Sequence, residues 1–324
     1  MRGSVQMRPV LGLARVWRFA GATVRYAARM ISRWWLLWML VPLTGCLAVS
    51  RSGGGGGTDL QLRRQERDGA GNWKTVTRTA QWDPRRTAVI VCDMWDDHWC
   101  QSASARVGEL VEPMNGFLAE ARSRGMLVIH APSSVTGFYD GTPAREMARK
   151  APFAATPIPL ATAERWGTRW CWPDPTRESV LPIDDSDMGC SCSGTKCTVR
   201  EAWKRQHAGI VIQPGDALTD DGQETWNLLA QRGVDHVILC GVHLNMCVLG
   251  RPFAIRQMVR LGKDVALARD LTDTMYNPER PPGVDHFTGT DLVVSHVERH
   301  WCPSFVSSDL TGGKPFRFAG DGRK

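Results

Sequence analysis

Short apolar runs alternate with segments of helical periodicity through most of the chain. The runs are long enough for buried strands and too short for helices, so we predict strands at residues 87–92, 126–130, 209–213, 237–240 and 265–268. Apolar residues recur at helical spacing elsewhere, and we predict helices at about residues 107–121, 145–150, 220–232, 245–261 and 291–300. Strands that alternate with helices are typical of a parallel sheet covered on both faces.

The predicted fold is α/β: a doubly wound, mainly parallel sheet with helices on both faces, in three layers. Right-handed crossovers give the strand order 3-2-1-4-5-6, counted along the chain. This order reverses between strands one and four, and ligands bind outside the carboxyl ends of strands at such a reversal. Asp93 ends the first strand, and Cys247 lies just past the fourth. The topology is therefore predicted to bring these two residues together, although they are far apart in the sequence.

Cys247 is predicted to lie in the first turn of a helix, after the tight turn at Gly241. Unpaired backbone N–H groups and the positive end of the helix dipole favour a thiolate at such a position. A thiolate there is a better nucleophile than a thiol in a core. The alternative is that Cys247 is a small core residue, as most free cysteines are.

The other segments set the domain boundaries. We assign residues 60–310 to one folded domain and residues 311–324 to a C-terminal tail. Residues 152–206, rich in Pro, Trp, Asp and Cys, are interpreted as an insertion packed over one edge of the sheet and not as a second domain. Residues 60–81 are polar and mixed, and the turn-rich stretch at residues 68–72 favours an edge hairpin.

Residues 1–45 differ from the body of the chain. They hold seven arginines and no acidic residue, and Leu43-Thr-Gly-Cys46 follows the short apolar stretch at residues 34–43. This order resembles a bacterial lipoprotein signal peptide, and the apolar stretch is too short to span a bilayer comfortably. The resemblance implies cleavage before Cys46, acylation of Cys46, and an exported protein anchored by lipid to a bacterial membrane and facing the periplasm. The alternatives are an uncleaved anchor and a shorter leader that starts at Met30.

The leader also accounts for the net charge. The whole chain carries +7, which equals the seven arginines of the leader, so residues 46–324 are neutral. A neutral body gives no electrostatic reason to expect nucleic-acid binding. The glycine run at residues 52–57 predicts a flexible tether over residues 46–59. Nine cysteines follow Cys46, and because nine is odd, at least one stays free even where others pair in an oxidising compartment.

The apolar strand that ends in Asp93 and the segment Gly241-Val-His-Leu-Asn-Met-Cys247-Val on a strand-to-helix turn resemble the isochorismatase-like cysteine hydrolases. The resemblance covers roughly residues 86–302, and Asp270 at the end of the next predicted strand also fits it. It implies an Asp–Lys–Cys triad in which Asp93 is the general base and Cys247 the nucleophile. It also implies a cis peptide bond between Val242 and His243, and an oxyanion site that includes the Cys247 N–H.

Two features depart from the family pattern. The triad lysine is expected near the end of the third strand, where Gln213 stands instead, and glutamine donates a hydrogen bond but supplies no charge. Nicotinamidases of the family carry an Asp and two His after the second strand. Here that region holds only His130 and the distant Asp140. We therefore expect neither the nicotinamidase metal nor a cofactor.

Further residues are candidates for substrate binding. These are Trp95, Asp97, His130, Arg251 and Asp270. Asp97 either lines the mouth of the site or belongs to a solvated loop. Arg251 either holds a substrate carboxylate, supplies the missing positive charge, or forms a salt bridge to a neighbouring loop.

A loop at residues 184–197 holds three cysteines, Cys190, Cys192 and Cys197. Their spacing is not a standard zinc pattern. A disulfide from Cys197 to Cys192 or to Cys190 is favoured over a bound metal.

These features predict a lipid-anchored cysteine hydrolase of a small amide or a related substrate. The alternative is a catalytically weak member of the family that binds a small molecule or a protein at the cell envelope, an interpretation that the missing lysine favours. The expected partners are a small-molecule substrate and a membrane. Homo-oligomers are common in the family, but the sequence names neither the number of subunits nor the substrate.

Overall fold

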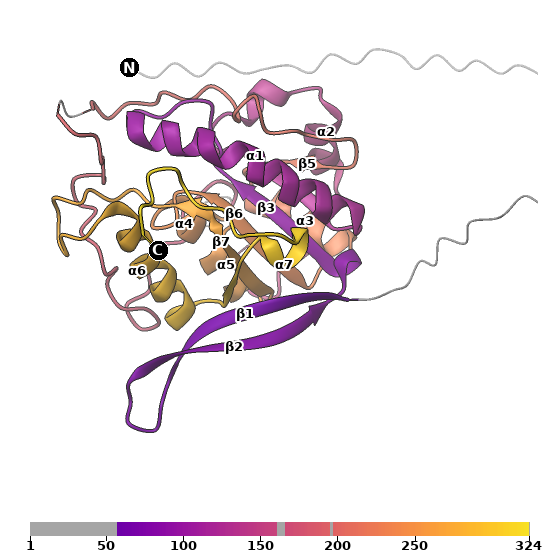
Figure 1. Ribbon diagram of the computed structural model, residues 1–324. Coiled ribbons are helices and arrows are strands. Elements are labelled where there is room, and N and C mark those ends of the chain that lie inside the picture. Colours follow the sequence, from indigo (N-terminus) through magenta and orange to yellow (C-terminus); the bar gives the residue numbers. More distant parts are fainter. Residues whose placement is uncertain (1–56, 161–165, 195–196, 324) are drawn as a thin grey trace, which may run out of the picture. The chain divides into compact units, whose positions relative to one another are not determined.

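The computed structural model describes residues 57–160, 166–194 and 197–323 (Figure 1). The predicted signal peptide, most of the predicted tether and the predicted lipidation site Cys46 lie outside these residues. Residues 53–324 form one unit, which includes both the sheet and the predicted insertion. Within the described part of the chain, no helix combines the length and the apolar character needed to cross a membrane.

An eight-stranded sheet forms the centre of this unit, in the order β2-β1-β8-β7-β6-β3-β4-β5. The strand bounds are β1 Thr58–Arg67, β2 Trp73–Trp82, β3 Thr87–Cys92, β4 Leu127–Ala131, β5 Ala217–Leu218, β6 His236–Val242, β7 Asp264–Asp273 and β8 Ser304–Phe305. Strands β3 to β8 run parallel to one another. Every residue of β3 is buried, as expected for an apolar strand that is covered on both faces.

The strand order differs from the predicted order in two respects. A hairpin adds two strands beyond β8, and the third parallel strand is β5 instead of residues 209–213. Residues 209–213 form a loop in which Ile210 is buried and Val211 is 47% exposed. The prediction was wrong because a short apolar run fits a strand and a partly buried loop equally well, whereas a two-residue strand gives no periodic signal. The order does reverse between β3 and β6.

The predicted edge hairpin is confirmed. Strand β1 pairs with β2 in antiparallel fashion over its full length, and in the turn the Asp68 side chain accepts hydrogen bonds from the N–H groups of Ala70 and Asn72. Strand β1 joins the rest of the sheet through a pairing of Arg63 with Ser304 of β8. Among the residues that the structure describes, the first strand begins at Thr58, shortly before the predicted boundary at residue 60.

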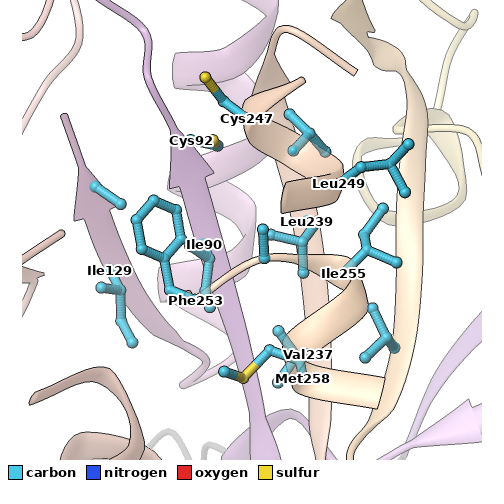
Figure 2. Packing of buried hydrophobic residues seen from close by; sticks show 14 of the residues in the cluster. Ile90, Cys92, Ile129, Val237, Leu239, Cys247, Leu249, Phe253, Ile255 and Met258 are labelled. Atoms are coloured by element: carbon cyan, nitrogen blue, oxygen red, sulfur yellow. The ribbon is translucent and has the colours of Figure 1, made fainter. Parts of the chain in front are cut away.

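Helices cover both faces of the sheet, as predicted (Figure 1). The helix bounds are α1 Gln101–Ser123, α2 Pro143–Lys150, α3 Gly222–Gln231, α4 Cys247–Gly250, α5 Ile255–Arg260, α6 His286–His300 and α7 Ser308–Thr311, with 3-10 turns η1 Pro84–Arg86 and η2 Thr136–Tyr139. Helices α1 and α7 share an apolar cluster with Val89 of β3, and α3, α5 and α6 share one with Ile90. Figure 2 shows part of the second cluster, with Cys247 at one end and its sulfur turned away from Leu239.

The predicted helix over residues 245–261 is interrupted. It consists of the short helix α4 and the separate helix α5. Pro252 explains the break, because proline lacks an N–H donor and forces the preceding residue out of the helical region. That residue, Arg251, has φ −66° and ψ 154°. Arg251 is consequently the residue that ends α4, and it does not lie on a continuous helix face with Cys247.

A buried carboxylate connects the insertion to the body. Glu178 accepts hydrogen bonds from both Nε and Nη2 of Arg256, at 2.8 and 2.9 Å. The same carboxylate contacts His296 Nε2 at 3.1 Å and accepts a hydrogen bond from the Trp301 indole at 3.0 Å. All four side chains are buried. Since Arg256 belongs to α5 and His296 to α6, this one carboxylate ties the insertion to two helices.

Candidate active site

The carboxyl ends of β3 and β6 approach each other closely at the point where the strand order reverses. Gly241 near the end of β6 has φ +97°, and a Cβ atom there would lie 2.0 Å from the Cys92 carbonyl oxygen. Only glycine fits both conditions. The residues that follow the two strands, Asp93 and Cys247, are therefore held side by side.

Asp93 is fully buried and has a strained backbone, with φ +45°. Its own N–H donates to the Ala131 carbonyl at 3.1 Å. Its carboxylate accepts hydrogen bonds from the Ser133 N–H at 2.7 Å and from Arg251 Nε at 3.2 Å. A buried carboxylate is thus fixed by backbone and side-chain donors at the end of β3.

Cys247 is the first residue of α4, is 6% exposed, and lies close enough to Asp93 for the charge of that carboxylate to act on its thiol. Burial, and then the negative charge of Asp93, raise the pKa of the thiol far above its usual range. The expectation that the helix terminus favours a thiolate was wrong for the resting site. Helix α4 has only four residues, so its dipole is small beside the effect of burial. Burial and the neighbouring carboxylate therefore both favour the neutral form of the thiol.

Arg251 supplies a positive charge to this pair. Its guanidinium forms an ion pair with Asp93, and its positive charge acts on the Cys247 thiol, whose pKa it lowers against the effects of burial and of Asp93. The ring of Trp170, from the insertion, lies beneath it, with the guanidinium carbon 4.8 Å from the ring centroid. Trp170 packs so closely on Gly250 that a Cβ there would lie 2.5 Å from its ring. The sequence left the role of Arg251 open, and the structure places it against the acid and the thiol.

The charges within this group balance. Burial raises the pKa of Asp93, and the positive charge of Arg251 together with hydrogen bonds from Cys247 and Ser133 opposes that rise. The arginine side chain is only 12% exposed and the aspartate side chain 0%. Each charge therefore depends on the other to remain buried. Transfer of the thiol proton to Asp93 would leave the total charge of the group unchanged.

The segment between β6 and α4 presents backbone N–H groups beside the thiol. The peptide bond between Val242 and His243 is cis, the bond for which the family resemblance implied that geometry. The His243 carbonyl accepts hydrogen bonds from Met246 and Val248, the two neighbours of Cys247. As the first residue of α4, Cys247 has an N–H without a partner inside the helix. That N–H is a candidate donor to the oxyanion that forms on a substrate carbonyl oxygen when the sulfur attacks the carbonyl carbon.

Aromatic side chains from two distant segments form a wall near the site. The Trp95 indole donates to the Ser133 carbonyl at 3.1 Å, and its ring stacks on Trp203 of the insertion with centroids 4.2 Å apart. Trp203 also stacks on His98, whose ring lies edge-on to His243 at 5.0 Å. Burial lowers the pKa of His98 to about 4. This wall is therefore uncharged at neutral pH, and the insertion supplies part of it.

A second buried carboxylate, Asp273, lies close to His243. It forms an ion pair with Arg106 at 2.7 Å and contacts His286 Nε2 at 2.8 Å. Burial alone would raise its pKa, but the charges of Arg106 and His286 hold it well below the usual range. Asp273 was not among the predicted site residues because the apolar run that predicts this strand ends at residue 268, whereas β7 continues to Asp273. The sequence feature that could have indicated Asp273 is an acidic residue at the end of a strand, the same feature that indicated Asp93.

Contacts away from Asp93 and Cys247 hold three of the predicted site residues, Gln213, His130 and Asp270, whereas Asp97 is exposed in the loop after β3. Gln213 is exposed, and its N–H donates to Asp216, so it does not occupy the place of the triad lysine. His130 is fully buried, with its ring nitrogens at hydrogen-bonding distance from Gln206 and Asp216, and is not at a pocket rim. Exposed Asp97 accepts from the His98 N–H.

Asp270 anchors the C-terminal segment and does not reach the site. Its carboxylate accepts two hydrogen bonds from Ser307 and one from the Phe316 N–H. It lies within β7 and not at the end of that strand, because the strand is longer than the apolar run that predicted it.

The described cysteines are all free thiols. The disulfide predicted between Cys197 and Cys192 or Cys190 is therefore absent from the described part of the chain. The sulfurs of Cys192 and Cys197 lie 3.5 Å apart, too far for a covalent bond. Among the described residues, Cys100, Cys190 and Cys192 are the group whose ligand atoms are close enough to hold a metal ion.

The chain is similar to several solved structures. A cysteine hydrolase from Pseudomonas syringae pv. phaseolicola 1448A has 18% sequence identity and a TM-score of 0.41, over 70% of this chain and 92% of that one. An isochorismatase family protein from Desulfovibrio vulgaris subsp. vulgaris str. Hildenborough has 17% identity and a TM-score of 0.35, over 66% and 90%. An isochorismatase from Pseudomonas putida KT2440 has 10% identity and a TM-score of 0.40, over 70% and 91%.

No family model matches the chain, and no curated protein does. At these identities and TM-scores the likeness carries no conclusion about activity. We therefore infer the function from the geometry of the chain's own residues.

Proposed function

We propose that this chain is a hydrolase with a cysteine nucleophile, of the isochorismatase-like kind, that acts on a small amide or a related substrate. One observation carries the proposal: the buried carboxylate of Asp93 forms an ion pair with Arg251, and both charges lie close enough to the Cys247 thiol to act on its pKa. A nucleophile next to a base, with the base oriented by a third group, is the arrangement that covalent catalysis requires.

The proposed reaction has two steps. The thiol proton moves to Asp93 as the sulfur attacks the carbonyl carbon, the C–N bond breaks, and the proton leaves with the amine, so that a thioester remains on Cys247. Water then attacks the thioester after giving a proton to Asp93. That proton returns to the sulfur as the acid product leaves. The Cys247 N–H is the proposed donor to the oxyanion in both steps.

In this proposal Arg251 takes the electrostatic role of the family's lysine. Arginine stays protonated in proteins, so it stabilises a thiolate by its charge and its hydrogen bond but donates no proton during the reaction. The alternative of a catalytically weak binding protein depended on the lack of a cation near the thiol. The positive charge of Arg251 next to the thiol supports the enzyme over that alternative.

The test is to trap the covalent intermediate. The purified chain is mixed with a panel of small primary and secondary amides, quenched in acid, and digested for peptide mass spectrometry. We expect an acyl adduct on the peptide that contains Cys247, and neither adduct nor hydrolysis in Cys247→Ala. Cys302→Ala is the control, since this buried thiol belongs to the core. An adduct on a different residue, or hydrolysis that persists in Cys247→Ala, would contradict the proposal.

We also propose that the protein is exported and anchored to a membrane through a lipid on Cys46. This rests on the leader pattern of the sequence alone. Metabolic labelling with an alkyne fatty acid, followed by intact-mass measurement of the membrane fraction, is expected to show a chain that begins at acylated Cys46. In Cys46→Ser the label and the cleavage are both expected to be lost. Equal labelling of the two proteins would refute the anchor, and Cys171→Ser serves as a control for general cysteine acylation.

A further inference from the structure

Four cysteines gather beside the start of α1, outside the triad. The sulfurs of Cys100, Cys190 and Cys192 all lie within 4.8 Å of one another. The Cys192 sulfur is 3.8 Å from that of Cys100 and 3.5 Å from that of Cys197. Cys100 immediately precedes α1, whereas the other three belong to one loop of the insertion. The fold thus brings a distant fourth thiol to a loop that already holds three.

The spacing of these sulfurs fits a metal site better than a disulfide. A disulfide needs an S–S distance of about 2.05 Å and joins only two sulfurs. Zinc binds thiolates tetrahedrally at about 2.3 Å, which places neighbouring sulfurs about 3.8 Å apart. The distances from the Cys192 sulfur to the sulfurs of Cys100 and Cys197, 3.8 and 3.5 Å, are close to that value. The sequence favoured a disulfide because only three cysteines are near one another in the chain, and nothing in their spacing points to Cys100.

A backbone N–H and a hydroxyl contact the sulfurs, and the N–H donates to one of them. The Ser102 N–H donates to the Cys192 sulfur at 3.3 Å, and the Ser102 hydroxyl lies 3.2 Å from the Cys100 sulfur. The Ser191 hydroxyl is 2.8 Å from that of Ser102 and accepts a hydrogen bond from Arg106. Donors of this kind stabilise thiolates and orient them toward a metal.

The cluster is also accessible enough to be loaded. Cys190, Cys192 and Cys197 are partly exposed, whereas Cys100 is buried and packs with Trp99 and Met275. One ligand is therefore fixed in the core, and three lie on a loop that can approach it.

We propose that Cys100, Cys190, Cys192 and Cys197 bind one zinc ion. The ion fastens the insertion to the start of α1. Thiolate ligands suit zinc and not magnesium or calcium, which take oxygen ligands. With all four positions filled by protein, the site is structural and has no open position for substrate.

The position of the site explains what the ion does for the fold. Cys100 follows His98 and Trp99 directly, and the loop that carries the other three ligands leads into Trp203. A zinc ion here holds together the two segments that form the aromatic wall of the candidate active site. The described residues of the insertion contain no helix and no strand, so a metal ion would fix a segment that regular backbone hydrogen bonding does not.

The test measures metal and thiols in the same protein. The full chain is purified with and without a chelator, zinc is quantified by mass spectrometry, and thiols are counted by alkylation before and after metal removal. We expect one zinc per chain, alkylation of the four cluster cysteines only after chelation, and a thiolate-to-cobalt charge-transfer band when cobalt replaces zinc. Cys192→Ser should lose the metal. Cys171→Ser, a matched change elsewhere in the insertion, should retain it.

Three results would overturn the proposal: unmutated protein without zinc, zinc that remains in Cys192→Ser, or a disulfide-linked peptide containing Cys192 in the non-reduced digest. If Cys192→Ser does not fold, the cobalt spectrum and the protection of the cluster thiols in the unmutated chain decide the question. None of these readouts depends on hydrolysis, so the zinc site and the proposed activity can fail separately.

Discussion

Replacing Asp93 by asparagine is expected to lower kcat/KM for hydrolysis about 10²–10⁴-fold, the range for loss of a positioned general base. The amide keeps the size of the carboxylate but cannot take the thiol proton. Asp93 is the carboxylate that forms the ion pair with Arg251 and whose charge acts on the Cys247 thiol. The measurement is steady-state kinetics with any amide identified by acyl trapping. Asp97→Asn makes the same chemical change at an exposed position of the following loop and should leave kcat/KM unchanged.

The pH profile distinguishes this role from a purely structural one. The base must be ionised, so kcat/KM should fall as the pH drops through the pKa of Asp93, which burial raises above its ordinary value of 3.8. Asp93→Asn should lose this acidic limb. Arg251→Met should lower kcat/KM about 10²–10³-fold, as for other electrostatic donors, and Arg251→Lys should lower it less. Full activity in Arg251→Met would show that the arginine is not part of the catalytic group.

Replacing Glu178 by alanine is expected to destabilise the fold by about 3–5 kcal/mol, the usual effect of breaking a buried ion pair. Arg256, whose side chain is 4% exposed, would keep its charge without a partner. His296 and Trp301 would lose the same acceptor. Urea unfolding at neutral pH measures this loss. Glu146→Gln, which breaks an exposed pair with Lys150, should leave the unfolding midpoint in place.

The sign of the pH dependence follows from the pKa of Glu178. Burial acts to raise it, but the hydrogen bonds from His296, Arg256 and Trp301 outweigh burial and hold it far below its ordinary value of 4.5. A lowered native pKa stabilises the fold above the unfolded pKa, and this contribution is lost as the pH falls below it. Acid should therefore destabilise the unmutated protein more steeply than Glu178→Ala. Parallel curves for the two proteins would mean that Glu178 is not ionised in the native state.

The sequence predicted the parts of the fold that have strong local patterns. Four of the five predicted strands are strands of the buried sheet, and their short apolar runs marked β3, β4, β6 and β7. Knowledge of the reversal in strand order was then enough to bring Asp93 and Cys247 together. This inference needed only the strand ends, since adjacent parallel strands end at the same edge.

The remaining features depend on single residues or on distant contacts. Pro252 ended a helix that the apolar spacing continued, and this change gave Arg251 its position. A two-residue strand such as β5 has no period, so Gln213 was placed at a strand end that is not there. The contact of Cys100 with Cys192 joins residues that no spacing rule relates. Such contacts arise from packing, which a single sequence does not display.

The cation of the catalytic group has one more consequence. A lysine in this place would lose its proton, and with it the charge that its neighbours need, at high pH. A guanidinium keeps its proton at every pH that a folded protein tolerates. Arg251 also rests on the face of Trp170, which holds the guanidinium in place without adding a titrating group. A change of pH around the protein would therefore act on the proposed reaction through Asp93 and the thiol, and not through the arginine beside them.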